Sequence, residues 1–138
     1  MEINITEIKN LISNSMIFNI KLGDSRYDII GILGNPIDIA HQKKSSPEIL
    51  SYGALQFYLK DNKLRGFSFY SSKIGFYNNI YFQEIHKSDI INFVKKSNYI
   101  FFENKSFLNE DVIYTINGID YLFSNNILIS FGIFKDFS

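Results

Sequence analysis

Two histidines, and the carboxylates near one of them, are the side chains in this sequence best suited to acid–base chemistry or metal binding. His41 lies in a polar segment, and His86 lies at the expected start of a helix with Glu84 and Asp89 nearby. The histidines lack the i, i+4 spacing of a metal-binding helix, and no motif sets an acid partner beside either one. Glu84 and Asp89 fit the negative charge that is favoured at a helix start. We expect no catalytic residue and no metal site, and we interpret both histidines as surface or capping residues.

The sequence also lacks the patterns that mark cofactor and nucleic-acid sites. Its eight glycines occur singly, without the GxGxxG or GxxxxGK spacing of a phosphate-binding loop, so we expect no cofactor. The formal net charge is zero, which argues against nucleic-acid binding because neutralising phosphates requires clustered basic side chains. A small hydrolase that uses His41 or His86 with a carboxylate stays as an alternative, although no nucleophile motif accompanies either histidine.

Cysteine usage and hydropathy indicate the compartment. The chain has no cysteine, which excludes a disulfide framework and fits a reducing environment. Its first residues show no signal-peptide pattern, and no stretch approaches the roughly 20 apolar residues of a membrane span. We expect a soluble, cytoplasmic protein without a membrane partner.

Length and composition predict one sheet-rich domain over residues 1–138. The hydrophobic fraction is 46%, with 14 Phe and 9 Tyr, and aromatic and β-branched residues favour pleated, half-buried surfaces. A chain of this length fits a single domain with one core.

Three helices are predicted from apolar spacing and capping residues. The first covers 4–15, where Asn4 and Glu7 can form a capping box ahead of an apolar stripe. The second begins with a capped turn at 25–28 and ends at Gly34, because Pro36 prevents continuation. Ser88 is the expected cap of the third, which ends near Lys95–Lys96.

Two hairpins with period-two alternation are the firmest strand predictions. In the first, Leu55, Phe57 and Leu59 precede a turn at 61–63, and Phe67 and Phe69 follow it. In the second, the residues expected to face the core are Ile119, Tyr121 and Phe123 before a turn at 124–126, and Phe131 and Ile133 after it. Further strands are expected within 74–82, 99–102 and 112–116, and residues 35–48 are expected to form a loop.

The two halves align with one another. An offset of 64 residues superposes Leu55 on Ile119 and Phe67 on Phe131, and an offset of 61 superposes the helix starts at 28–30 and 89–91. We interpret residues of about 23–72 and 86–136 as pseudo-repeats; the alternative is that alternation makes any two amphipathic hairpins align. The predicted fold class is α+β, with two tandem helix-plus-antiparallel-sheet units that form one continuous antiparallel sheet with helices packed on one face.

The alternate parity of the hairpins predicts a second sheet face that points away from the helices. Tyrosines on such a face favour protein interfaces, because a large ring supplies contact area at low rotamer cost. The alternative is that the N-terminal helix or a second subunit covers this face. The candidate partner-binding residues are Gln56, Tyr58, Ser68, Tyr70, Asp120, Leu122, Ser130 and Phe134.

Three short motifs carry a resemblance to a known class of proteins. They are Leu33-Gly34-x-Pro36-x-Asp38, Tyr52-Gly53-x-Leu55-x-Phe57-x-Leu59 and Lys63-Leu64-x-x-Phe67-x-Phe69. This pattern resembles immunity proteins of bacterial polymorphic and contact-dependent toxin systems, and the helix exit followed by meandering strands is similar to the β-lactamase-inhibitor-protein-like fold.

The resemblance implies a function without catalysis. An immunity protein binds a cognate protein toxin domain and neutralises it by covering its active site. The alternative function is a structural or self-associating interaction module, and a homo-oligomer is left open. The two are distinguished by growth rescue in the presence of the toxin and by sedimentation.

Overall fold

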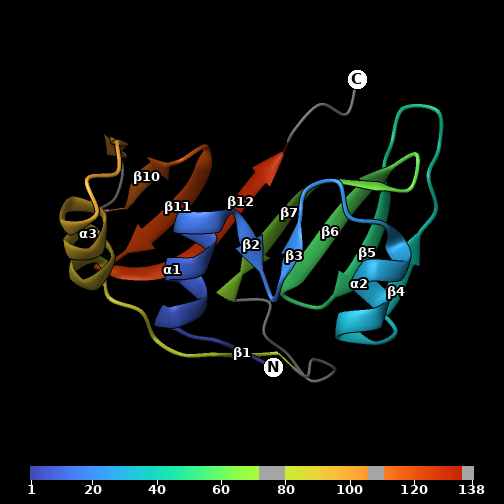
Figure 1. Ribbon diagram of the computed structural model, residues 1–138, viewed down its shortest axis with the longest axis horizontal. Helices are drawn as coiled ribbons and strands as arrows, with labels where there is room; N and C mark the ends of the chain where they lie inside the picture. Colours follow the sequence, from blue (N-terminus) through green and yellow to red (C-terminus); the bar gives the residue numbers. More distant parts are fainter. Residues whose placement is uncertain (72–79, 106–110, 135–138) are drawn as a thin grey trace.

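The fold is α+β, with three helices on one side of a mostly antiparallel sheet. The computed structural model describes residues 1–71, 80–105 and 111–134. Viewed as in Figure 1, the helices and a small hairpin lie in front of the sheet. The helices are α1 (Ile5–Asn14), α2 (Arg26–Leu33) and α3 (Lys87–Lys96).

Eight strands form the main sheet in the order β4-β5-β6-β7-β12-β11-β10-β9, with every neighbouring pair antiparallel. The strands are β4 (Asp38–Ala40), β5 (Glu48–Tyr52), β6 (Leu55–Lys60), β7 (Lys63–Tyr70), β9 (Phe101–Lys105), β10 (Val112–Ile116), β11 (Ile119–Ser124) and β12 (Ile127–Phe134). Each half is a meander of consecutive strands, and the halves meet where β7 pairs with β12, which we call the seam.

The 64-residue offset found in the sequence also relates the strands of the two halves and the residues that pair at the seam. Strands β5, β6 and β7 begin 64 residues before β10, β11 and β12, and each has the same length as its counterpart. Ser68 pairs across the seam with Gly132, which is the residue 64 positions later. Common descent of the two halves stays a prediction.

Two-residue turns connect β6 to β7 and β11 to β12. Asp61 and Asn62 in the first hairpin, and Asn125 and Asn126 in the second, have positive φ angles between 52° and 65°. Two consecutive left-handed residues match the right-handed twist of the flanking strands, and Asn and Asp tolerate this conformation better than other side chains. The predicted turns at 61–63 and 124–126 therefore lie in the right places, and Lys63 and Ser124 belong to the adjoining strands.

The predicted N-cap residues are correct at two starts and wrong at the third, and the capping box predicted for Asn4 and Glu7 does not form. Asn4 accepts a hydrogen bond from the backbone N–H of Glu7, and the Glu7 side chain turns instead to the N–H of Phe18. The full capping box lies at Ser25–Asp28, and its hydrogen bonds from Ser25 lower the pKa of Asp28. The third helix begins one residue before Ser88, at Lys87 after His86, which makes no side-chain cap bond.

Several short strands were not predicted from the sequence. Residues 38–40, expected to lie in a loop, form the edge strand β4. Strands β2 (Met16–Ile17) and β3 (Ile20–Lys21) form a small separate hairpin, and β1 (Glu2–Ile3) pairs in parallel with β8 (Tyr81–Phe82). Of the strand predicted within 74–82, residues 74–79 lie outside the described residues, and β8 is separate from the main sheet.

The core lies between the helices and one face of the sheet. Side chains from α1 (Ile8, Leu11), α2 (Ile29) and α3 (Ile90, Val94) are buried there. The odd-numbered hairpin residues that were predicted to face the helices all belong to this core: Leu55, Phe57, Phe67, Phe69, Ile119, Tyr121, Phe131 and Ile133.

Candidate binding surface

The face of the main sheet opposite the helices, which we call the open face, carries the alternate hairpin residues. Strand register sets them in two rows that cross the seam. One row runs through Gln56, Ser68, Gly132, Asp120 and Thr115, each paired with the next. The other row runs through Tyr70, Ser130, Leu122 and Ile113. Because neighbouring strands lie about 4.8 Å apart, consecutive residues of a row are close neighbours, and the first row is interrupted only at Gly132, which has no side chain.

The N-terminal helix does not cover the open face. Buried residues of α1 belong to the core on the other side of the sheet. Two hydrogen bonds hold α1 there. The side-chain amide of Asn117, in the β10–β11 turn, donates to the carbonyl of Ile12 at 2.9 Å, and the hydroxyl of Tyr99, between α3 and β9, donates to Oγ of Ser13 at 3.2 Å. Of the two covers considered from the sequence, the N-terminal helix is therefore excluded.

Hydrogen bonds hold the tyrosine at the centre of the first half. The hydroxyl of Tyr58 donates to Oε1 of Gln56 at 3.2 Å and shares a hydrogen bond of 2.9 Å with Oγ of Ser68. All three side chains are partly exposed. A ring fixed in this way loses little further conformational entropy when a partner packs on it.

A hollow of about 510 Å³ lies on the open face at the seam. It forms because both rows carry small residues where the two halves meet: Ser68 and Gly132 in one row, and Ser130 in the other. Larger side chains border these positions, with Tyr70 on one side and Leu122 and Ile113 on the other. Tyr70 is 42% exposed.

The structure brings most of the predicted binding residues together. Gln56 and Tyr58 form the hydrogen-bonded group beside the seam. Phe134 pairs with Gly66 at the end of β12, and its side chain lies outside the described residues. The five that line the hollow are Ser68, Tyr70, Asp120, Leu122 and Ser130.

Sequence reasoning missed three residues of this surface. Ile113 and Thr115 share the open face, and the parity rule applied to the predicted strand at 112–116 could have found them. Gly132 has no side chain to attract attention, and its importance arises from its pairing with Ser68.

The histidines lie apart from the open face and from one another. The Nε2 atom of His86 is 3.5 Å from Oε2 of Glu84, and both side chains are more than half exposed. His41 is also exposed, in the segment after β4. Within residues 1–71, 80–105 and 111–134, no group of three His, Cys, Asp or Glu side chains is arranged to hold a metal ion.

Two other hollows lie on the helix side of the molecule, and each contains a cationic side chain that already has a partner. One of about 690 Å³ borders α2, where Nη1 of Arg26 lies 3.7 Å from the carboxylate of Glu48. One of about 750 Å³ borders α1 and α3, where Nζ of Lys9 lies 5.3 Å from the ring centre of Phe93. The open-face hollow differs from these two in position, because its polar side chains lie on the side of the sheet away from the helices.

Replacing Gly132 with alanine is expected to lower the free energy of unfolding by about 1–3 kcal/mol, the range typical of added core volume. A Cβ atom at this position would lie 3.0 Å from the backbone oxygen of Phe67, which the sheet holds in place. The strands at the seam would have to separate to relieve this contact. Urea denaturation of the two proteins measures the difference.

The matched control is Gly31→Ala on α2, where a Cβ meets nothing within 4 Å. Alanine is favoured over glycine inside helices, so this variant should gain roughly 0.5–1 kcal/mol. A Gly132→Ala protein as stable as the parent would contradict the close packing at the seam.

Comparisons with known proteins relate the chain to two distant structures. No family model and no curated protein matches the sequence. An extracellular SCP-domain protein from Bacillus anthracis str. Ames shares 11% identity over 84% of this chain, with a TM-score of 0.47, and this chain spans 44% of that protein. A DUF4309 family protein, YjgB, from Bacillus subtilis subsp. subtilis str. 168 shares 10% identity over 95% of both chains, with a TM-score of 0.40.

At this level of similarity, neither structure assigns an activity to the chain. The helices are also informative: in the described ranges, none has the length and apolar character needed to traverse a bilayer. Among the described residues, the candidate binding surface is the open face with its hollow at the seam.

Proposed function

We propose that this chain is a binding protein that holds a partner protein against its open face without turnover, and that it acts as an immunity protein for a toxin domain. The observation that carries the proposal is the placement of the helices on one side of the sheet, so that within the described ranges no helix lies over the opposite face. That face combines exposed tyrosine with hydroxyl and amide groups, a mixture typical of protein interfaces.

The rigidity of the surface supports inhibition by occlusion. The candidate residues lie on paired strands of an eight-stranded sheet, and hydrogen bonds fix Tyr58 between Gln56 and Ser68. A preorganised surface binds tightly because it loses little entropy on association. The immunity role itself rests on the resemblance of the Leu33–Asp38, Tyr52–Leu59 and Lys63–Phe69 motifs to immunity proteins.

The test is co-expression with the product of the neighbouring gene, which we expect to contain the toxin domain. We expect growth rescue and a complex that copurifies. Replacing Tyr58 and Tyr70 together with alanine should weaken the complex by about 2 kcal/mol or more, roughly thirtyfold in Kd, because aromatic anchors at the centre of an interface dominate binding. Isothermal titration calorimetry measures the change.

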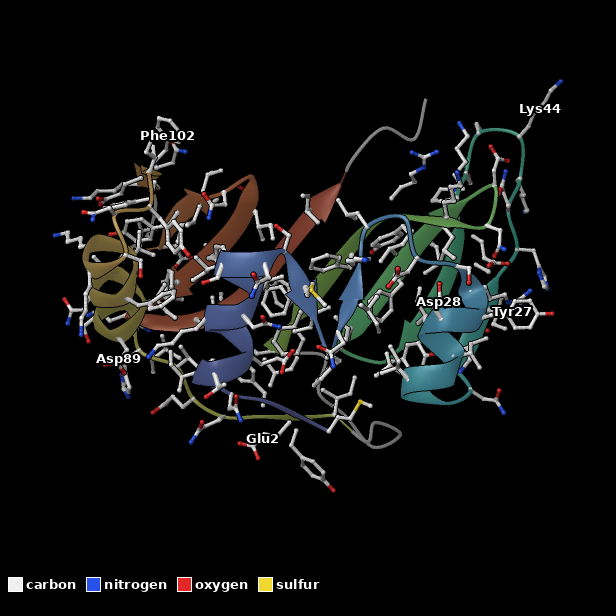
Figure 2. The ribbon with its side chains drawn as sticks, in the orientation of Figure 1. Glu2, Tyr27, Asp28, Lys44, Asp89 and Phe102 are labelled. Carbon is white, nitrogen blue, oxygen red and sulfur yellow. The ribbon has the colours of Figure 1, made fainter. Side chains whose placement is uncertain are left out.

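Tyr27→Ala is the matched control, since Tyr27 is 82% exposed on α2, on the other side of the molecule. Figure 2 shows its side chain extending outward from that helix. Tyr27→Ala should leave Kd unchanged. Equal losses in the two variants, or rescue by a protein with an altered open face, would place the interface elsewhere.

A second candidate function is self-association through the edge strand β9. Four of its five residues are exposed, and Phe102 is 66% exposed, extending from the end of the sheet (Figure 2). An exposed edge strand offers unpaired backbone groups to another strand. Sedimentation equilibrium distinguishes the two candidates, because a monomer at all concentrations contradicts self-association.

A further inference from the structure

The open-face hollow has one charged side chain in an otherwise uncharged lining. Among the described residues that line it, Asp120 alone carries a charge. Asp120 pairs with Gly132 on one side and Thr115 on the other, so its side chain stands at the border of the space that Gly132 leaves. The hollow therefore has a negative pole that no lysine, arginine or histidine in this lining balances.

A hydrogen bond orients the carboxylate of Asp120 and leaves it able to accept further hydrogen bonds. The Thr115 hydroxyl donates to Oδ1 at 2.6 Å, and the described residues give Oδ2 no hydrogen bond. A carboxylate offers about four acceptor positions across its two oxygens. The threonine fixes its direction and leaves most of those positions to an incoming donor.

The walls of the hollow suit the remainder of a long basic side chain. Leu122 lies two residues from Asp120 on the same strand, and Ile113 pairs with Leu122 on the next strand, so both provide apolar contact near the carboxylate. Tyr70 borders the same hollow with an exposed ring. Lysine and arginine bury their methylene stems on apolar surface, and their cationic ends are attracted to carboxylates and aromatic faces.

We propose that this hollow receives a basic side chain of the partner, with the cation bound to Asp120 and the methylene stem against Leu122 and Ile113. This inference rests on the proposed function, because it names the chemistry by which the open face recognises a partner. The small residues at the seam, Ser68, Ser130 and Gly132, make the space that the side chain enters.

The first test needs no partner. The ¹⁵N-labelled protein is titrated with propylguanidinium, and with butyramide as a neutral probe of similar size. We expect amide shifts confined to residues that line the hollow, with Kd on the order of millimolar for so small a ligand. Asp120→Asn keeps the shape of the side chain and removes its charge, so it should weaken propylguanidinium binding roughly tenfold and leave butyramide unaffected.

Equal shifts from both probes, or propylguanidinium binding unchanged in Asp120→Asn, would overturn the inference. Circular dichroism and the amide spectrum of the variant confirm that it is folded. Thr115→Val is a second variant that keeps the charge and removes the hydroxyl that orients it. It should retain more of the propylguanidinium binding than Asp120→Asn does, and the reverse order would also contradict the proposal.

The second test separates this inference from the proposed function. In a complex with the partner, Asp120→Asn is expected to raise Kd on the order of tenfold, and the effect should shrink at high salt. If Asp120→Asn binds the partner like the parent while the Tyr58/Tyr70 double variant does not, the open face is the interface, and the inference that a basic side chain binds Asp120 is wrong. If neither variant alters binding, the proposed surface itself is wrong.

Discussion

Phe131→Ala is expected to lower the free energy of unfolding by about 3–5 kcal/mol, the range for removing a buried aromatic ring. Phe131 is 3% exposed and lies on β12 at the seam. Its ring stacks on that of Phe69, with the ring centres 5.1 Å apart. The ring centres of Phe67, also on β7, and of Tyr121, on β11, lie 6.4 Å and 6.3 Å from that of Phe131. Deleting the ring removes contacts that join the two halves.

The control for Phe131→Ala is Phe102→Ala on the exposed edge strand. Phe102 is 66% exposed, so its removal should change stability by no more than about 0.5 kcal/mol. Guanidinium denaturation followed by circular dichroism gives both values. If Phe131→Ala cost less than about 1 kcal/mol, the seam would not be a principal source of stability. If the variant were unfolded in buffer, a Phe131→Leu protein would keep the comparison measurable.

Tyr121→Phe is expected to raise the free energy of unfolding by about 1–3 kcal/mol, which is the cost of a buried polar group without a partner. Tyr121 is fully buried, and its hydroxyl has no hydrogen-bond partner among the described residues. Burial also raises the pKa of this hydroxyl well above its ordinary value. Phe57, which lies 64 residues earlier on β6, has a ring without a hydroxyl in the same core.

Tyr52→Phe is the matched control, because it removes the same atom from a satisfied environment. The Tyr52 hydroxyl donates to the carbonyl of Gly34 at 2.8 Å, and burial raises the pKa of Tyr52 to about 12. Its loss should cost about 1 kcal/mol, so the two substitutions should have opposite signs. Thermal and urea denaturation measure both. Destabilisation in both variants would mean that a buried water pairs with Tyr121.

Local patterns predicted the β6–β7 and β11–β12 hairpins well because the connections within them are short. Alternation of Leu55 to Leu59 and Ile119 to Phe123 identified the buried parity, and Asn residues at left-handed positions marked the turns. Strand β10 (Val112–Ile116) has the bounds that were predicted. These features depend on interactions within a few residues, which a sequence displays directly.

Non-local pairing was beyond the sequence pattern. Strand β4 covers three residues of a polar segment and exists because β5 offers it an edge. The β1–β8 pair joins segments about 80 residues apart, and neither strand is long enough to show alternation. The start of α3 was misplaced because serine is a favoured N-cap residue, whereas the N-cap in the structure is His86, two residues before Ser88.

The candidate surface was predictable in part for the same reason. Period-two alternation assigned Tyr58, Ser68 and Asp120 to one face, and strand register sets them there. The hollow could not be foreseen, because it depends on which residues of the two halves meet. Only the pairing of Ser68 with Gly132 and of Tyr70 with Ser130 brings the small side chains together.

The seam also bears on how quickly the chain reaches its native state. Within the main sheet, every strand pair except β7–β12 joins consecutive strands, whereas the seam joins residues about 60 apart, such as Tyr70 and Ser130. Closing a long loop costs entropy before its contacts form, so non-local pairings slow folding. Each meander can form its hairpins from local contacts, so we expect docking of the two along β7 and β12 to be the slow step of folding.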